Sequence, residues 1–138
     1  MNKATNKRAM ILGTGIDIVE IARIKRAYDR WGIRFAERVL TAPEREAMLA
    51  RKDEATYLAS RFAAKEAFLK ALGTGYAHGI SWHDMEVRRK KGERPHLTIG
   101  GRAHDLMKEM NAETVHLSLS HEKKFAIAQV ILEKQSFT

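Results

Sequence analysis

Small and apolar residues alternate along residues 10–19, MILGTGIDIV, with the two-residue period of a β-strand. One face of this predicted strand carries Leu12, Thr14, Ile16 and Ile18, and the other carries Gly13, Gly15, Asp17 and Val19. The apolar period then becomes helical, and we expect a helix from about Glu20 to Trp31 that Gly32 ends. The chain therefore opens with a strand that leads directly into a helix.

A second helical region begins at the sequence TAPE, residues 41–44. Thr41 stands where an N-cap is expected and Glu44 follows three residues later, which is the pattern of a capping box. The helical pattern continues to Leu72, with a break predicted near residues 52–54, and Gly73 ends it.

After Gly73 the pattern favours strands. The expected elements are strands at residues 85–89 and 96–99, a helix at 102–110, and strands at 114–120 and 125–132, the last two joined by a hairpin connection. We therefore predict an α+β fold in which a largely antiparallel sheet packs on helices.

The long helix carries charges where its apolar face should be. Leu58, Phe62, Leu69 and Leu72 form one stripe, and Arg61, Lys65 and Glu66 fall within it or at its edges. The opposite face has only small residues, Ser60, Ala63, Ala64, Ala67 and Ala71, so another backbone can approach it closely. Charges on a helix packed on both sides must pair, bind a metal or face a ligand. An internal Lys–Glu ion pair is the structural alternative to a functional site.

Asp17 is a second candidate, because it lies on a strand of Ile and Val just before a helix. It shares a face with two glycines, where another group can come close. An N-cap formed with Glu20 is the structural alternative. Asp17 and Glu66 together offer two carboxylates. Such a pair suits Mg²⁺, since that ion completes its coordination shell with water and substrate phosphates. The basic residues Arg61, Lys65, Lys70 and His121 would then serve the phosphates.

The composition favours an anionic partner. The 138 residues, enough for one domain, carry a formal charge of +8 and no cysteine. Residues 1–9 read as a disordered extension or tag remnant, so residues 10–138 form the expected domain, which remains basic without them. No stretch is apolar enough to span a membrane. The absence of cysteine fits a reducing compartment, and we expect a cytoplasmic location.

Arginines line one face of the first predicted helix. Arg23, Arg26 and Arg30 lie opposite the apolar residues Ile21, Ile24, Tyr28 and Trp31. Such a stripe suits docking to an acidic protein or to phosphates, and an ordinary solvated face is the alternative. A nucleic-acid-binding role is not expected, because exposed aromatic residues are not interleaved with the basic ones and no recognition motif occurs.

Three stretches together closely resemble the holo-acyl-carrier-protein synthases, the small bacterial 4′-phosphopantetheinyl transferases. They are GTGIDIVEIARI at residues 13–24, RFAAKEAFLKALGTG at 61–75 and HLSLSHEKKFAIAQVIL at 116–132. The resemblance extends from about residue 11 to 133. It implies transfer of the phosphopantetheine arm of coenzyme A to a serine of apo acyl carrier protein, with Mg²⁺ as cofactor and adenosine 3′,5′-bisphosphate as product, in support of fatty acid biosynthesis.

The resemblance also implies roles for the candidate residues. Asp17 and Glu66 would hold the magnesium ion, and Glu66, Asp17 and Lys70 would form the catalytic set. The residues expected to bind coenzyme A are Arg61, Lys65, Lys70, Gly73 and His121, with Lys65 beside the pyrophosphate. Arg23, Arg26 and Arg30 would dock the acidic carrier protein.

Members of this short class are typically homotrimers with active sites shared between subunits. In the expected mechanism the carrier serine attacks the β-phosphorus of coenzyme A in line. Glu66, acting through a metal-bound water, is the predicted general base, and a metal-bound hydroxide formed without Glu66 is the alternative.

Overall fold

The computed structural model describes residues 7–137 and the side chains of residues 8–134. Its elements are β1 (Lys7–Glu20), α1 (Ile21–Trp31), α2 (Ile33–Val39), α3 (Ala42–Leu49), α4 (Glu54–Leu72), the short 3₁₀ helix η2 (Trp82–Asp84), β2 (Met85–Arg88), β3 (His96–Ile99), α5 (Gly101–Glu109), β4 (Thr114–His121) and β5 (Phe125–Phe137). Helices and antiparallel strands are both present, which confirms the predicted α+β class.

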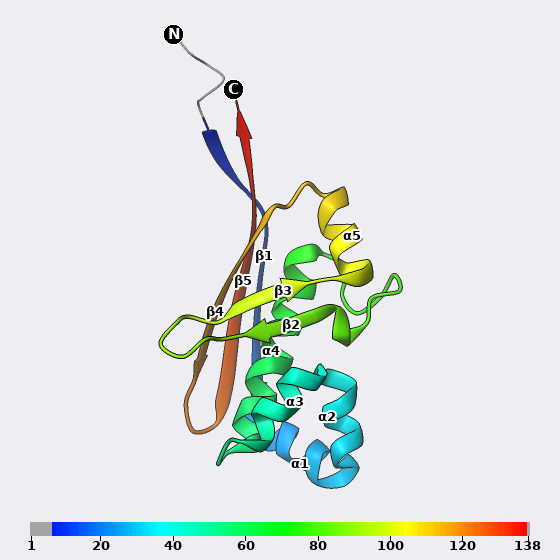
Figure 1. The fold of residues 1–138 in the computed structure, drawn as a ribbon, viewed down its shortest axis with the longest axis vertical. Coiled ribbons are helices and arrows are strands. Elements are labelled where there is room, and N and C mark those ends of the chain that lie inside the picture. Colours follow the sequence, from blue (N-terminus) through cyan, green and yellow to red (C-terminus); the bar gives the residue numbers. More distant parts are fainter. Residues whose placement is uncertain (1–6, 138) are drawn as a thin grey trace.

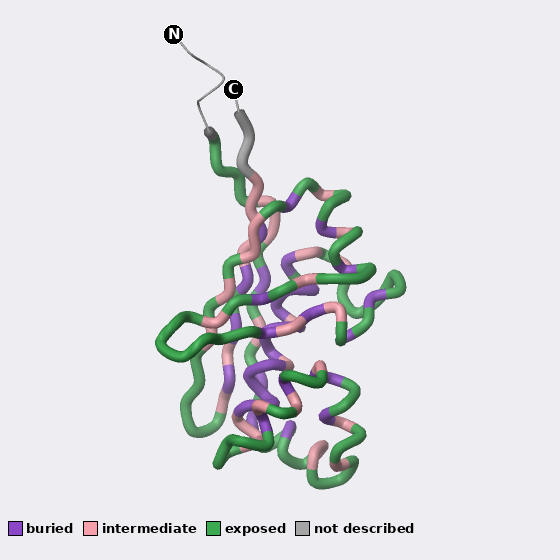
Figure 2. Tube along the Cα trace, viewed as in Figure 1, coloured by how far each residue is buried: buried purple, intermediate pink, exposed green. Residues whose placement is uncertain are grey.

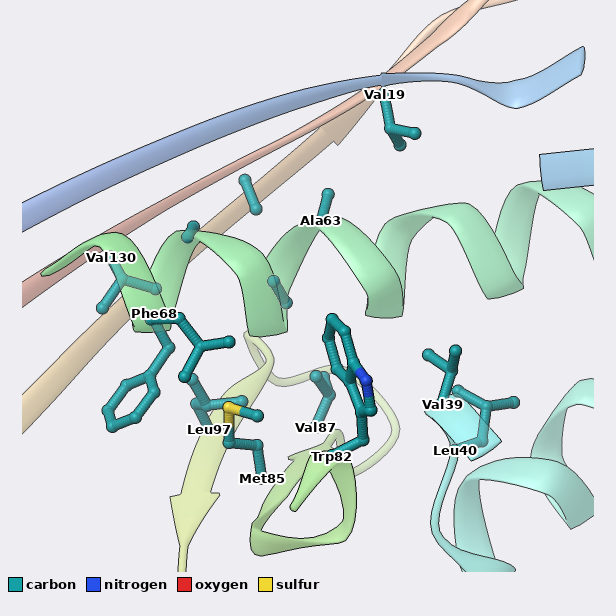
Figure 3. Packing of buried hydrophobic residues seen from close by; sticks show 14 of the residues in the cluster. Val19, Val39, Leu40, Ala63, Phe68, Trp82, Met85, Val87, Leu97 and Val130 are labelled. Atoms are coloured by element: carbon teal, nitrogen blue, oxygen red, sulfur yellow. The ribbon is translucent and has the colours of Figure 1, made fainter. Parts of the chain in front are cut away.

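Helix α4 lies between two antiparallel sheets. The larger sheet has the strand order β1–β5–β4, and the smaller one pairs β2 with β3. The three strands of the larger sheet run along one side of the molecule (Figure 1). Helices α1–α3 lie near one end of α4, and α5 lies near the other. The smaller sheet and η2 cover the side of α4 that faces away from the larger sheet (Figure 3).

The core forms around α4, whose residues are mostly buried (Figure 2). Phe68 and Leu69 have no exposed surface, and neither do Met85 of β2 and Val130 of β5. Because both sheets contribute buried side chains to it, α4 is held from two sides. The predicted packing of both helix faces is therefore confirmed.

The close approach expected at the small-residue face occurs between α4 and β1. A Cβ atom added at Gly15 would overlap the carbonyl oxygen of Ala67, and one added at Gly13 would overlap that of Ala71. The two backbones meet because each contributes only small residues at the contact. This contact places the end of β1, including Asp17, directly against α4.

We predict that Gly15→Ala destabilises the fold strongly. The added methyl group meets backbone on α4 that cannot move aside, and overpacking of this kind costs about 1–3 kcal/mol or more. Chemical denaturation measures the change. Gly100→Ala is the matched control, because Gly100 has a φ of −132° and a Cβ there stays 4.0 Å from its nearest neighbour. An equal loss in both variants would contradict the packing explanation.

The strand alternation predicted for residues 10–19 is interrupted at Leu12. A register shift between Ile11 and Gly13 leaves Leu12 without a partner on β5, and its side chain packs against the core. The bulge thereby turns Ile11 to the outer face of the sheet, which Ile16 and Ile18 also occupy. Leu12 therefore does not share a face with Ile16, as the simple alternation predicted.

The N-terminal half differs from the sequence-based expectations in two further respects. Strand β1 begins at Lys7, so the disordered extension predicted for residues 1–9 is wrong for residues 7–9, and residues 1–6 lie outside the described residues. Helix α2 was not predicted, because it has seven residues and no side-chain cap to mark its start. Among the described residues, no helix is long and apolar enough to cross a membrane.

Candidate active site

Helix α4 is well defined at both ends, which fixes the positions of its charged residues. Asp53 caps its start by accepting a hydrogen bond from the backbone N–H of Thr56 at 3.0 Å. Gly73 ends it in the left-handed conformation, with φ at 86°. The predicted helix end at Gly73 is confirmed.

The first cluster of functional groups lies where β1 crosses α4. Lys70 Nζ is 3.1 Å from Asp17 Oδ1 and also donates to the carbonyl oxygen of Ile16 at 2.8 Å. Asp17 is only 14% exposed, whereas Lys70 is 52% exposed. The lysine therefore reaches from solvent into the site and partly neutralises Asp17.

Glu66 belongs to the same cluster and is half-buried. Burial raises the pKa of its carboxyl group above the ordinary value, and the negative charge of Asp17 raises it further. The positive charges of Lys70 and Arg23 act in the opposite direction. The structure thus brings together Asp17, Glu66, Lys70 and Arg23 from β1, α4 and α1.

These residues fit a magnesium ion better than a metal held by protein ligands alone. In the described part of the chain, no group of three or more His, Cys, Asp or Glu side chains could hold a metal. Mg²⁺ needs only one or two protein carboxylates, because water and phosphate oxygens complete its octahedron. Asp17 and Glu66 supply two carboxylates close enough to repel each other, and a divalent cation would remove that repulsion.

A basic cavity of about 800 Å³ forms the second part of the candidate site. It is lined by Arg51, Lys52, Asp53, Thr56, Tyr57, Ser60, Arg61, Arg89, Leu119, Ser120, His121, Glu122 and Lys123. Two of the predicted coenzyme A ligands, Arg61 and His121, are therefore in one cavity. A smaller cavity of about 370 Å³ shares Arg51, Tyr57, Arg61 and Arg89 with it. The cationic lining suits a phosphorylated ligand.

Arg61 has a free donor in this region. Its guanidinium group lies 4.0 Å from the centroid of the Tyr57 ring, and one of its terminal nitrogens donates to Ser60 Oγ at 2.9 Å. Its Nε atom is buried without a hydrogen-bond partner. Because a buried donor without a partner is costly, this N–H group is suited to donate a hydrogen bond to a phosphate oxygen.

The sequence did not single out several residues of the cavity. Arg51, Lys52 and Arg89 line it, and the guanidinium of Arg51 lies 5.2 Å from the Tyr57 ring centroid. Lys52 stands in the break predicted near residues 52–54 and Arg51 directly before it, so two consecutive basic residues were the available signal. Arg89 follows β2 and is brought to the cavity only by the tertiary fold.

The prediction that Lys65 lies beside the pyrophosphate is wrong. Lys65 has no exposed surface, and its Nζ atom is 2.7 Å from Oε1 of Glu44, which is also buried. Burial lowers the pKa of Lys65, while the carboxylate of Glu44 acts to raise it. The structural alternative of an internal Lys–Glu ion pair is therefore correct for Lys65, and its partner is Glu44.

The arginines of α1 are exposed, as the docking hypothesis requires. Arg26 is 3.5 Å from Glu20, and Arg30 lies 4.9 Å from the centroid of the Trp31 ring. Arg23 differs from the other two arginines, because its positive charge acts to lower the pKa of Glu66.

Comparison with known proteins places these features in a family. The family model for the 4′-phosphopantetheinyl transferase superfamily matches residues 13–130. The chain belongs to this superfamily. It is therefore a phosphopantetheinyl transferase, and the resemblance noted in the sequence is confirmed.

Relatives of this transferase are similar over most of their length. The chain is 48% identical over 125 residues to a holo-[acyl-carrier-protein] synthase of Maridesulfovibrio salexigens, which covers 91% of this chain and 100% of the relative. The crystal structure of the synthase from Neisseria meningitidis has a TM-score of 0.84 and 37% identity, over 91% of this chain and 100% of that one. A synthase from Bacillus anthracis in complex with CoA (3′,5′-ADP) has a TM-score of 0.76 and 42% identity, over 91% and 98%.

We predict that Glu66→Gln stabilises the metal-free protein increasingly as the pH rises. A raised carboxyl pKa means that the folded state binds the proton more tightly than the unfolded state, so Glu66 costs stability as the pH rises through that pKa. Melting temperatures in chelator between about pH 4 and about pH 8 span the ionisation of a glutamate. Glu46→Gln, at an exposed position on α3, should give no such trend. A variant that loses stability relative to wild type with rising pH would refute this reading of the Glu66 environment.

Proposed function

We propose that this transferase moves the 4′-phosphopantetheine group of coenzyme A to a serine of an apo acyl carrier protein, with Mg²⁺ as cofactor. The product would be adenosine 3′,5′-bisphosphate. The observation that carries the proposal is the cluster in which Glu66 is held beside Asp17 and Lys70. The names of the similar proteins support the choice of an acyl carrier protein as the acceptor.

The basic cavity would bind the nucleotide end of coenzyme A. Arg61 offers its unpartnered Nε, and Arg51, Lys52 and His121 add positive charge or hydrogen-bond donors around the same space. The related synthases of Bacillus anthracis and Helicobacter pylori have structures in complex with coenzyme A or its 3′,5′-ADP part, which supports this assignment.

The reaction would be an in-line displacement at phosphorus. The serine oxygen of the carrier forms a bond to the β-phosphorus of coenzyme A, and the bond from that phosphorus to the bridging oxygen of the pyrophosphate breaks. The bisphosphate departs with the bridging oxygen and its electron pair. The serine proton would move to the carboxylate of Glu66 through a water molecule.

The other groups of the cluster stabilise charge. Asp17 and Glu66 would hold Mg²⁺, which supplies neutralisation of the pyrophosphate charge and fixes its geometry when bound. Lys70, which extends from solvent to Asp17, can contact the phosphate that leaves. Arg23 adds a further positive charge near Glu66.

An intact-mass assay tests the reaction directly. Apo acyl carrier protein is incubated with this protein, coenzyme A and Mg²⁺, and we expect a mass gain of one phosphopantetheine that EDTA abolishes. The carrier with its acceptor serine replaced by alanine is the control. Absence of a gain with several carriers and a folded enzyme would refute the proposed function, and a gain that survives EDTA would refute the metal requirement.

The arginines of α1 are proposed to dock the carrier protein. They form an exposed basic row on the helix that follows Asp17, so a carrier bound there would have its serine close to the cluster. Complementary charge of this kind steers association more than it changes the chemical step.

We predict that Arg30→Glu raises the KM for the carrier at least about tenfold and leaves kcat within about twofold, because a surface charge affects encounter rather than chemistry. Arg30 is a better test residue than Arg23, because the charge of Arg23 also affects the pKa of Glu66. Steady-state kinetics with each substrate varied would measure this. Lys108→Glu, exposed on α5 at the other end of the molecule, is the control (Figure 1). An altered KM for coenzyme A with an unchanged KM for the carrier would exclude the docking role.

A homotrimer with shared active sites is proposed as the working assembly. Ile11, Ile16 and Ile18 are 63%, 60% and 60% exposed on the outer face of β1, which is an unusual place for three isoleucines unless another surface covers them. The two parts of the candidate site also have no lining residue in common, since neither cavity is lined by Asp17, Glu66 or Lys70. A second copy that brings its cavity to the cluster of the first would complete the site.

The proposed biological setting follows from the reaction. Residues 10–138 would act as one transferase domain in the cytoplasm, where the holo carrier protein supports fatty acid biosynthesis. No nucleic-acid partner is proposed.

A further inference from the structure

Lys65 uses all of its hydrogen-bonding capacity inside the protein. Its Nζ atom donates to the carbonyl oxygen of Val39 at 2.6 Å, to Glu44 Oε1 at 2.7 Å and to the carbonyl oxygen of Trp82 at 3.3 Å. A lysine ammonium group has three donors, so none is left for a substrate.

Both carboxylate oxygens of Glu44 likewise accept hydrogen bonds inside the protein. It is 1% exposed, and its Oε1 also accepts the backbone N–H of Thr41 at 2.9 Å. Its Oε2 accepts the backbone N–H of Val87 at 2.8 Å. The ion pair is therefore fully hydrogen-bonded, which is the condition under which buried charges are tolerated.

The ion pair connects α4 to four other segments. Its partners lie at the end of α2, at the start of α3, in η2 and in β2. Val39, Trp82 and Val87 all lie on the side of α4 that faces away from the larger sheet (Figure 3). The contact between β1 and α4 holds the opposite side, so the two contacts together fix the rotation of α4 about its axis.

That rotation matters for both parts of the candidate site. Glu66 follows Lys65 and interacts electrostatically with Asp17, while Arg61 stands about one turn before Lys65 and lines both cavities. Glu44 and Val87 also line the smaller cavity. An apolar pair of similar volume would often serve stability equally well, so stability alone does not account for the ion pair.

We propose that Lys65 and Glu44 are positioning residues, which orient α4 so that Glu66 and Arg61 meet their ligands without touching the substrate themselves. The inference rests on the proposed transferase function. A displacement of about 1 Å in a catalytic group can lower a rate by about 100-fold, so small changes in helix orientation are sufficient.

Two readouts on the full-length protein test this role. Lys65→Met, Glu44→Gln and the double variant are compared with wild type, and Lys108→Met on α5 is the matched control at an exposed position. Hydrogen exchange across α4 reports how firmly the helix is held, through its local opening, without any need for activity. Rates of carrier modification are measured well below each melting temperature, so that the folded population is compared.

We expect faster exchange around residues 61–66 in all three variants and a fall in kcat of about 10–100-fold, with little change in the KM for coenzyme A. The double variant should lose no more than the worse single variant, because each substitution breaks the same ion pair. If Lys65→Met does not fold, Glu44→Gln and the double variant, in which both charges are removed, still give the test.

Two outcomes would overturn the inference. One is an unchanged kcat in the folded variants, even where exchange is faster, which would make the pair purely structural. The other is a raised KM for coenzyme A in Lys65→Met alone with Glu44→Gln unaffected, which would mean that Lys65 contacts the substrate. An inactive wild-type protein would instead refute the proposed function, and the exchange measurement would still show whether the ion pair holds α4 in place.

Discussion

The close contact between β1 and α4 is the constraint on which the site depends. Gly13 and Gly15 allow the strand to meet the backbone of the helix at Ala67 and Ala71, and no larger residue fits at either glycine. This contact holds Asp17 next to Glu66 even though the two carboxylates repel each other and Glu66 is half-buried. The free energy of packing thus maintains an electrostatically unfavourable arrangement, which a bound cation would relieve.

The same helix serves two sites that face different directions. Arg61 lines the basic cavity together with His121 of β4, whereas Glu66 and Lys70 lie against β1. Glu66 stands five positions after Arg61 on the helix, which corresponds to about 140° of rotation beyond one full turn. A single bound coenzyme A molecule could therefore join these groups most simply across two copies of the chain, in keeping with the exposed isoleucines of β1.

The sequence was sufficient for most elements, because these depend on local patterns. That Asp17, Glu66 and Lys70 meet was expected only from the family resemblance, since Asp17 and Lys70 stand 53 positions apart. The glycines of β1, the alanines of α4 and the capping box at Thr41 each have a short-range signature. The partner of Lys65 was not predictable, since Glu44 stands 21 positions away and meets it only when α3 packs on α4. The cavity walls at Arg51 and Arg89 and the bulge at Leu12 likewise result from tertiary packing and strand register.

Subunit complementation tests the division of the site most directly. Glu66→Gln and Arg61→Met are purified as separate inactive variants and then mixed under conditions that exchange subunits. If each site takes Glu66 from one copy and Arg61 from another, an equimolar mixture recovers about a quarter of the wild-type rate, because random assembly leaves that share of the interfaces intact. A mixture as inactive as its components would show that both residues act within one chain and would contradict the shared site.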